Sequence, residues 1–91
     1  MSDHAKTITV LYFAAASTAT GITSEEVPIP ESGLKLLGLT ELLVSRHPNV
    51  GLKEIIDASQ WSVDLEMVDD PETILLKGGE EVAVICPVSG G

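Results

Sequence analysis

The sequence Glu80-Glu81-Val82-Ala83-Val84-Ile85-Cys86-Pro87-Val88-Ser89-Gly90-Gly91 combines the two features that decide the fold. Its apolar run up to Cys86 predicts a strand, and Pro87 ends that strand because proline lacks the N–H that a sheet requires. The residues from 87 to 91 predict an extended tail with a reach of roughly 17 Å, at about 3.4 Å per residue. Because Gly90 and Gly91 carry no Cβ, we expect the carboxylate of Gly91 to enter a narrow active site on another protein.

A frayed C-terminus is the simpler interpretation of the same ending. Small residues are common at chain ends, and most termini are poorly ordered. The strand and the proline that come directly before the two glycines favour a functional tail over a frayed one.

The composition predicts a single domain spanning residues 1–91, with a flexible start at residues 1–5. Hydrophobic residues make up 44% of the chain and aromatic residues only 3%, so the core must consist mainly of aliphatic side chains. No apolar run approaches the length of a membrane span, and the first residues do not resemble a secretory signal. We therefore expect a cytoplasmic protein without a membrane partner.

The net charge of −9 arises from 14 acidic residues and 5 basic ones. A surface of this sign is a poor match for nucleic acid, whose phosphates need basic side chains, whereas basic protein partners are favoured. The single cysteine, Cys86, and the histidines His4 and His47 do not have metal-ligand spacing, so we expect no metal site. For Cys86 we expect structural burial, and for His47 a favourable position at a helix C-terminus.

Alternation of apolar side chains predicts a first strand over residues 6–13. Ile8, Val10 and Tyr12 form one face of it, and Leu11 and Phe13 extend the other. Residues 14–21 are small and predict a loop or a short helical turn. Residues 23–30 carry Val27 and Ile29 in alternation and end in proline, which suits an edge strand forming a hairpin with the first.

An amphipathic helix is predicted over residues 34–47, and a further helical turn around residues 52–56. The sequence from Trp61 to Met67 alternates, which predicts a half-exposed strand with Trp61, Val63, Leu65 and Met67 inward and Ser62, Asp64 and Glu66 outward. Residues 69–71 and 77–80 predict turns, and residues 74–76 a short strand. The order β-β-α-β-β-β indicates an α+β fold in which a mixed sheet of about five strands wraps over one main helix.

Three stretches of the chain resemble the ubiquitin-like β-grasp sulfur carriers, and within that class the small subunits of molybdopterin synthase. Val10-Leu11-Tyr12-Phe13-Ala14 is similar to their first strand, Arg46-His47-Pro48 to the end of the helix in eukaryotic members, and residues 77–91 to their signature ending. The chain departs from the family pattern at Glu80, where aspartate is usual, and at Cys86, where proline is common. Residues 61–70 also lack the Ala-Val-Asn segment that is frequent in relatives.

The resemblance implies a β-grasp fold and a role in molybdenum cofactor biosynthesis. An activating enzyme would use ATP to attach AMP transiently to Gly91, and a sulfurtransferase would convert the adenylate to a thiocarboxylate. The tail of Pro87, Val88, Ser89, Gly90 and Gly91 would then insert into the large subunit and donate sulfur to cyclic pyranopterin monophosphate. The expected assembly is a heterotetramer of two small and two large subunits, with the active site on the large subunit and no permanently bound cofactor.

Strand alternation also predicts a partner surface beside the tail. If Val82, Val84 and Cys86 point inward, then Ala83 and Ile85 point outward. The resemblance to β-grasp folds implies that the first and last strands lie side by side, which would place Ala83 and Ile85 next to Leu11 and Phe13. An exposed apolar patch made of Leu11, Phe13, Ala83 and Ile85 suggests a protein interface. The alternative is that a loop or residues 14–21 cover these side chains.

Three other functions remain open on the sequence alone. A carrier that serves thiamine synthesis or transfer-RNA thiolation would also end in Gly-Gly. A ubiquitin-like modifier would be conjugated to lysines through Gly91. An acidic interaction domain would have this ending by chance, and deleting Gly91 would then leave its function intact.

Overall fold

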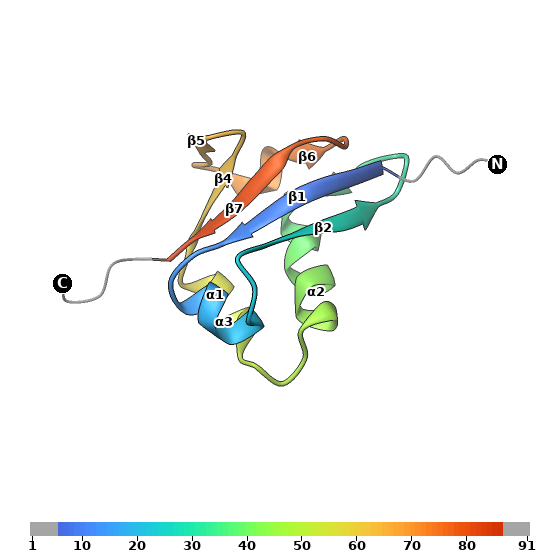
Figure 1. Cartoon of the computed structure of the whole chain (residues 1–91). Helices are drawn as coiled ribbons and strands as arrows, with labels where there is room; N and C mark the ends of the chain where they lie inside the picture. Colours follow the sequence, from blue (N-terminus) through green and yellow to red (C-terminus); the bar gives the residue numbers. More distant parts are fainter. Residues whose placement is uncertain (1–5, 87–91) are drawn as a thin grey trace.

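The computed structural model describes residues 6–86 and shows a mixed sheet with helices packed on one of its faces (Figure 1). The five-stranded sheet has the order β2-β1-β7-β4-β5, and a second sheet contains only β3 and β6. The elements in chain order are β1 (Lys6–Tyr12), α1 (Ala15–Thr20), β2 (Ser24–Ile29), β3 (Leu34–Lys35), α2 (Leu36–Arg46), α3 (Leu52–Asp57), β4 (Gln60–Val63), β5 (Glu66–Met67), the 3₁₀ turn η1 (Pro71–Thr73), β6 (Leu75–Leu76) and β7 (Glu81–Ile85).

The last strand lies at the centre of the large sheet. β7 pairs in parallel with β1, with Val82 opposite Val10, and antiparallel with β4, with Val84 opposite Trp61. β1 pairs on its other side with β2, which is the edge strand that the sequence predicted. Because β1 and β7 run in the same direction, both end at the same end of the sheet (Figure 1).

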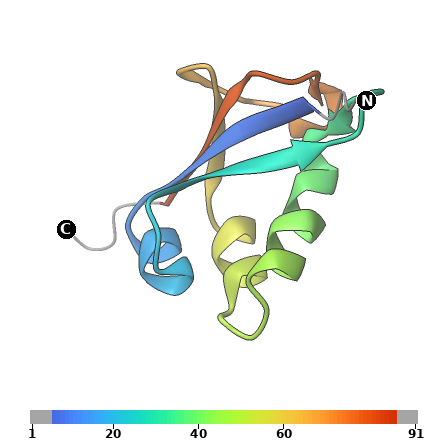
Figure 2. The same ribbon diagram turned by 45° about the vertical axis from the view of Figure 1, so that its right-hand side comes forward.

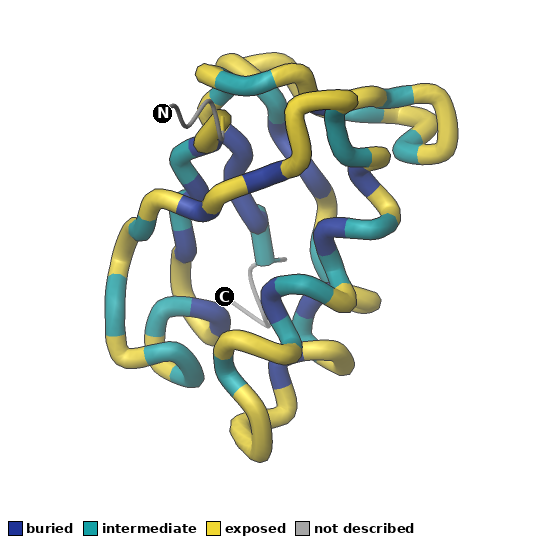
Figure 3. The backbone as a smooth tube through the Cα atoms, turned by 90° about the vertical axis from the view of Figure 1, so that its right-hand side faces the viewer, coloured by how far each residue is buried: buried dark blue, intermediate teal, exposed yellow. Residues whose placement is uncertain are grey.

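The core lies between the sheet and the helices that cover one face of it (Figure 2). The side chains of Ile8, Val10 and Tyr12 are buried there, as predicted, together with those of Val82 and Val84. From α2 the core receives Leu36, Leu39 and Leu43, which recur at the spacing of one helix face. Figure 3 shows the buried positions alternating with exposed ones along the chain, as expected for elements with one face in the core.

The predicted helix over residues 34–47 starts too early. Leu34 and Lys35 form β3, which pairs with Leu76 and Leu75, and the helix begins only at Leu36. Gly33 makes this pairing possible, because a Cβ at that position would lie 2.8 Å from the carbonyl oxygen of Leu76. The additional helical turn predicted around residues 52–56 is confirmed as α3.

The single strand predicted from Trp61 to Met67 is wrong, because the chain reverses in the middle of it. β4 and β5 form a hairpin in which Ser62 is opposite Met67 and Val63 is opposite Glu66. The two residues of the turn, Asp64 and Leu65, have φ values of 52° and 72°. Such a turn matches the twist of a two-stranded ribbon. Leu65 and Met67, predicted to point inward, are therefore exposed. Ser62 shares the outer face with Ala83, as predicted, but it is buried there and not in water.

The small-residue stretch 14–21 forms the short helix α1, one of the two possibilities that the sequence left open. β1 and β2 pair antiparallel, as predicted, but α1 separates them in sequence. Within residues 6–86, no helix has the length and apolar character needed to cross a membrane. In the same range, no group of three or more His, Cys, Asp or Glu side chains is arranged to hold a metal ion.

Candidate functional site

The tail predicted to carry the chemistry, from Pro87 to Gly91, lies outside the described residues. The structure describes its root at Cys86, directly after the central strand β7. The Cys86 thiol donates a hydrogen bond to the carbonyl oxygen of Phe13 at 3.3 Å, and the Ser59 hydroxyl donates one to the Cys86 sulfur at 3.4 Å. The root is thus tied both to the end of β1 and to the segment that follows α3.

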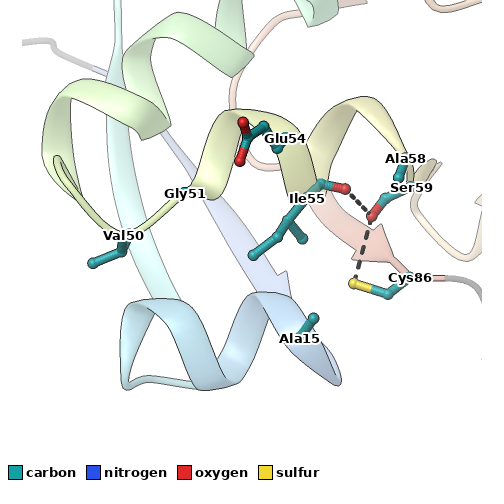
Figure 4. Close-up of a pocket in the computed structure, with 8 residues that line it drawn as sticks. All are labelled: Ala15, Val50, Gly51, Glu54, Ile55, Ala58, Ser59 and Cys86. Atoms are coloured by element: carbon teal, nitrogen blue, oxygen red, sulfur yellow. Dashed lines mark hydrogen bonds between the residues drawn. The ribbon is translucent and has the colours of Figure 1, made fainter.

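A hollow of about 460 Å³ lies beside the tail root, between α1 and α3 (Figure 4). Cys86 borders it and is half-buried, in contact with the core, so the predicted structural burial of this cysteine is confirmed only in part. The residues that line the hollow are Ala15, Val50, Gly51, Glu54, Ile55, Ala58, Ser59 and Cys86.

The predicted apolar patch lies on the sheet face opposite the helices. Leu11 and Ile85 are partly exposed there, and Phe13, just beyond β1, is 47% exposed. Ala83, predicted to be exposed, is only 7% exposed. Ala83 lies on the central strand between Leu11 and Ser62 of the two neighbouring strands, and its side chain is only a methyl group. Ala83 is thus the floor of the patch.

Met67 belongs to the same surface, although the sequence placed it in the core. Residues directly opposite each other in paired strands share a face of the sheet. The register places Leu11, Ala83, Ser62 and Met67 side by side across four strands, and Met67 is 52% exposed. A turn at Asp64-Leu65 moves Met67 from the inner to the outer face of the sheet. Such turns are usually marked in a sequence by Asn-Gly or Asp-Gly, which this chain lacks there, so the turn could not be predicted. We define the outer-face patch as Leu11, Phe13, Met67 and Ile85 above Ala83.

A carboxylate that the sequence analysis missed joins α2 to the sheet. Glu25 of β2 accepts hydrogen bonds from the Tyr12 hydroxyl at 2.5 Å and from Nε and a terminal nitrogen of Arg46 at 3.1 and 2.9 Å. Nε2 of His47 lies 2.7 Å from the same carboxylate, and the His47 ring meets the Tyr12 ring edge to face. His47 does end α2, as predicted. We call this cluster of four side chains the Glu25 cluster.

The electrostatics of the Glu25 cluster follow from its partial burial. Burial alone would raise the pKa of Glu25, but the hydrogen bonds from Tyr12, His47 and Arg46 outweigh it and hold that pKa below its ordinary value. The pKa of Tyr12 is raised by burial and by the neighbouring carboxylate, so its hydroxyl stays protonated and donates. Arg46 and His47 belong to the Arg46-His47-Pro48 stretch that resembles the end of the family's helix. Their contacts with Glu25 join the end of α2 to the sheet.

The turn before β7 is held by the side chain of Glu80. Its carboxylate accepts hydrogen bonds from the backbone N–H groups of Lys77 at 2.9 Å and Gly78 at 2.7 Å. Burial would raise the pKa of Glu80, but these backbone donors lower it overall. Gly78 has a φ of 120°, and a Cβ there would lie 2.8 Å from the Cβ of Lys6. The glutamate thus provides a carboxylate that closes this turn, where the family usually has aspartate.

A mixed sheet of this order over one principal helix, with its last strand at the centre, defines a ubiquitin-like β-grasp protein. The chain belongs to the ThiS family, whose profile matches residues 10–91.

Among curated proteins, the chain is 38% identical to a molybdopterin synthase sulfur carrier subunit of Mycosarcoma maydis, with all of both chains covered. It is 36% identical to the protein of that name from Homo sapiens, covering 92% of this chain and 93% of the relative.

Solved structures with lower sequence identity share the fold. One is the small archaeal modifier protein 1 of Methanosarcina acetivorans, with a TM-score of 0.73, 23% identity, and 98% and 100% of the two chains covered. Another is a chain in a complex of subunits 1 and 2 of the molybdopterin-converting factor from Helicobacter pylori, with a TM-score of 0.63, 19% identity, and 93% and 99% of the two chains covered.

Proposed function

We propose that this chain is the sulfur carrier subunit of a molybdopterin synthase and acts through Gly91 in molybdenum cofactor biosynthesis. The observation that carries the proposal is the match to carriers of that name along the whole chain, at 38% identity to the Mycosarcoma maydis protein. The position of β7 supports it, because a central, buried strand gives the tail a rigid base. We place the carrier in the cytoplasm.

Activation of Gly91 precedes sulfur transfer, because a carboxylate is a poor electrophile. A carboxylate oxygen of Gly91 attacks the α-phosphorus of ATP on the activating enzyme, which forms the acyl-adenylate and releases pyrophosphate. A donor with sulfur at the oxidation level of sulfide then attacks the acyl carbon. The new C–S bond replaces the bond to AMP, AMP leaves, and the tail ends in a thiocarboxylate with no net redox change.

Sulfur transfer then takes place in the active site of the large subunit. The thiocarboxylate sulfur forms a bond to a carbon of cyclic pyranopterin monophosphate as an oxygen substituent of that carbon leaves, and water then cleaves the bond between the acyl carbon and the sulfur. The sulfur stays on the pterin, and Gly91 returns to a carboxylate that can be activated again. A dithiolene contains two sulfur atoms, so each pterin requires two such transfers.

We expect the large subunit to bind to the outer-face patch. Its members are apolar and exposed, and Phe13 and Ile85 lie next to the tail root, so that one partner can cover the patch and receive the tail. An acidic chain suits a partner with a basic active-site entrance. The related fold of the Helicobacter pylori complex is consistent with a two-subunit assembly.

The same fold in a small archaeal modifier protein means that the fold does not choose between carrier and modifier. Intact-mass spectrometry of the chain, co-purified with the large subunit after incubation with the activating enzyme, ATP and a sulfide donor, distinguishes the two functions. We expect a mass increase equal to the difference between sulfur and oxygen, located at Gly91. An isopeptide bond from Gly91 to a lysine would indicate a modifier, and binding to a thiamine or transfer-RNA thiolation enzyme instead of the large subunit would indicate another carrier pathway.

A further inference from the structure

The tip of the β4–β5 hairpin exposes a leucine in a backbone conformation that does not suit it. Leu65 is 87% exposed and has a φ of 72°. A side chain with a Cβ is strained at such a φ, where glycine or asparagine is usual. The position therefore carries an unfavourable backbone conformation and an apolar side chain in water, and neither contributes to the fold. Strained positions of this kind concentrate at functional sites.

The hairpin holds Leu65 on a rigid support. The backbone N–H of Asp64 donates to the carbonyl oxygen of Glu81 at 2.8 Å, and the Asp64 side chain accepts from the Glu81 N–H at 2.9 Å. These two hydrogen bonds fix the turn to the start of the central strand β7. A turn whose backbone is held in place before binding loses little conformational entropy when a partner covers it.

The surroundings of Leu65 indicate the chemistry of the partner. A hollow of about 440 Å³ lies beside the hairpin, with apolar walls that include Val63 and Ile74. Four exposed carboxylates also line it, those of Asp64, Glu66, Asp69 and Asp70. An apolar wall with acidic groups above it suits an arginine or lysine, which buries its aliphatic stem and pairs its charge.

The hairpin is continuous with the outer-face patch. Met67 of β5 belongs to that patch and lies two residues from Leu65, whereas the tail root is at the other end of β7. A partner that covers the patch from Phe13 to Met67 reaches the hairpin tip by extending along β5. A second contact there would fix the orientation of the carrier as the tail enters the active site.

We propose that Leu65 is a second anchor for the large synthase subunit, inserted into an apolar socket bordered by arginine or lysine side chains that enter the acidic hollow. This inference rests on the proposed function, since it assigns the partner from it. The alternation in the sequence predicts Leu65 in the core. The hairpin instead exposes its side chain, and this exposure is what allows Leu65 to bind a partner.

Leu65→Asn tests the anchor without damaging the fold, because asparagine suits the left-handed backbone. Calorimetric titration of the whole carrier into the large subunit should show binding weakened about tenfold or more, the loss of a modest hot spot. Thermal unfolding should occur at the parent temperature or above it. The control is Leu37→Asn, which removes the same apolar side chain from an exposed position on α2, where it is 46% exposed, and should leave binding unchanged.

Glu66→Gln with Asp69→Asn tests the basic border of the socket. The double variant should bind more slowly and depend less on salt than the parent, because steering by charge is screened by ions. Amide hydrogen exchange should show residues 63–70 of the parent protected by the large subunit. An absence of protection there would overturn the inference, as would parent-like binding by Leu65→Asn.

The outcomes separate this inference from the proposed function. If Phe13→Asp weakens binding and Leu65→Asn does not, the second anchor is wrong while the carrier function stands. If the parent chain does not bind the large subunit, both are overturned. A dimer of the free chain that dissociates in the Leu65→Asn variant, seen by sedimentation, would assign the hairpin to self-association and also overturn the anchor.

Discussion

Phe13 and Val84 lie on opposite faces of the sheet, and one substitution at each residue separates interface from core. Phe13→Asp should leave the chain folded and weaken binding to the large subunit by about 2 kcal/mol or more, the scale of a hot spot. Val84→Asp should instead unfold the domain, since a buried charge without a partner costs several kcal/mol and total stability is only about 5–15 kcal/mol. Circular dichroism and titration calorimetry measure the two effects. A folded Val84→Asp variant, or an unfolded Phe13→Asp variant, would reverse the faces assigned here.

Gly90 is the residue at which a single methyl group should separate stability from function. Gly90→Ala adds a Cβ in a tail proposed to enter a narrow active site, and it closes backbone conformations that glycine can adopt. We expect the unfolding temperature to stay at the parent value while adenylation or sulfur transfer is severely impaired. Ser89→Ala is the matched control, because it keeps a Cβ and should remain active. Sulfur transfer by Gly90→Ala at the parent rate would contradict a narrow passage.

The faces of the central strands could be predicted from alternation alone. Ile8, Val10 and Tyr12 are buried as expected, because a period of two is enforced wherever one face is in the core. The burial of Ala83 depends on the size of its neighbours across two strands, which no local pattern contains. The Glu25 cluster could not be predicted either, because its contacts join residues that are 13 and 22 positions apart in sequence.

The Glu25 cluster fastens the end of α2 to β1 and β2, and this element-scale contact should make stability depend on pH. The folded-state pKa of Glu25 is lowered, so the ionised form stabilises the fold above the unfolded-state value of about 4.3. That contribution is lost as the pH falls through the lower, folded-state value. Glu25→Gln should cost about 1–3 kcal/mol near neutral pH and less below about pH 4, in urea unfolding series across pH. Glu26→Gln, exposed on the same strand, is the control, and an equal loss of stability in both variants would show that the cluster contributes nothing.

The elements whose boundaries were wrong share one cause. Leu34 and Lys35 have helix-like apolar spacing but pair with β6, and Asp64-Leu65 has strand-like alternation but forms a turn. In both places hydrogen bonds to distant residues decide the backbone, as with the two that join Asp64 to Glu81. Periodicity reports which side chains avoid water and does not report which backbone groups pair.

At the scale of the whole molecule, the fold places the tail root at the end of its central parallel strands. β7 lies between β1 and β4, and Cys86 is hydrogen-bonded to Phe13 and Ser59, so the last described residue is held by both layers of the fold. The α+β class and the single main helix could be predicted because the order of strands and helix restricts the packing. The tail chemistry was predicted from the resemblance, because residues 87–91, which are proposed to carry it, lie outside the described residues.

The most direct test of the carrier mechanism is a single turnover of sulfur transfer with purified components. Carrier bearing a thiocarboxylate at Gly91 is mixed with the large subunit and cyclic pyranopterin monophosphate, and mass spectrometry follows the carrier while molybdopterin is measured. We predict that sulfur leaves Gly91 in step with product formation, and that carboxylate carrier, or carrier extended by one residue after Gly91, forms no product. Molybdopterin formed by the carboxylate carrier, or product formed while the sulfur stays on Gly91, would contradict the account.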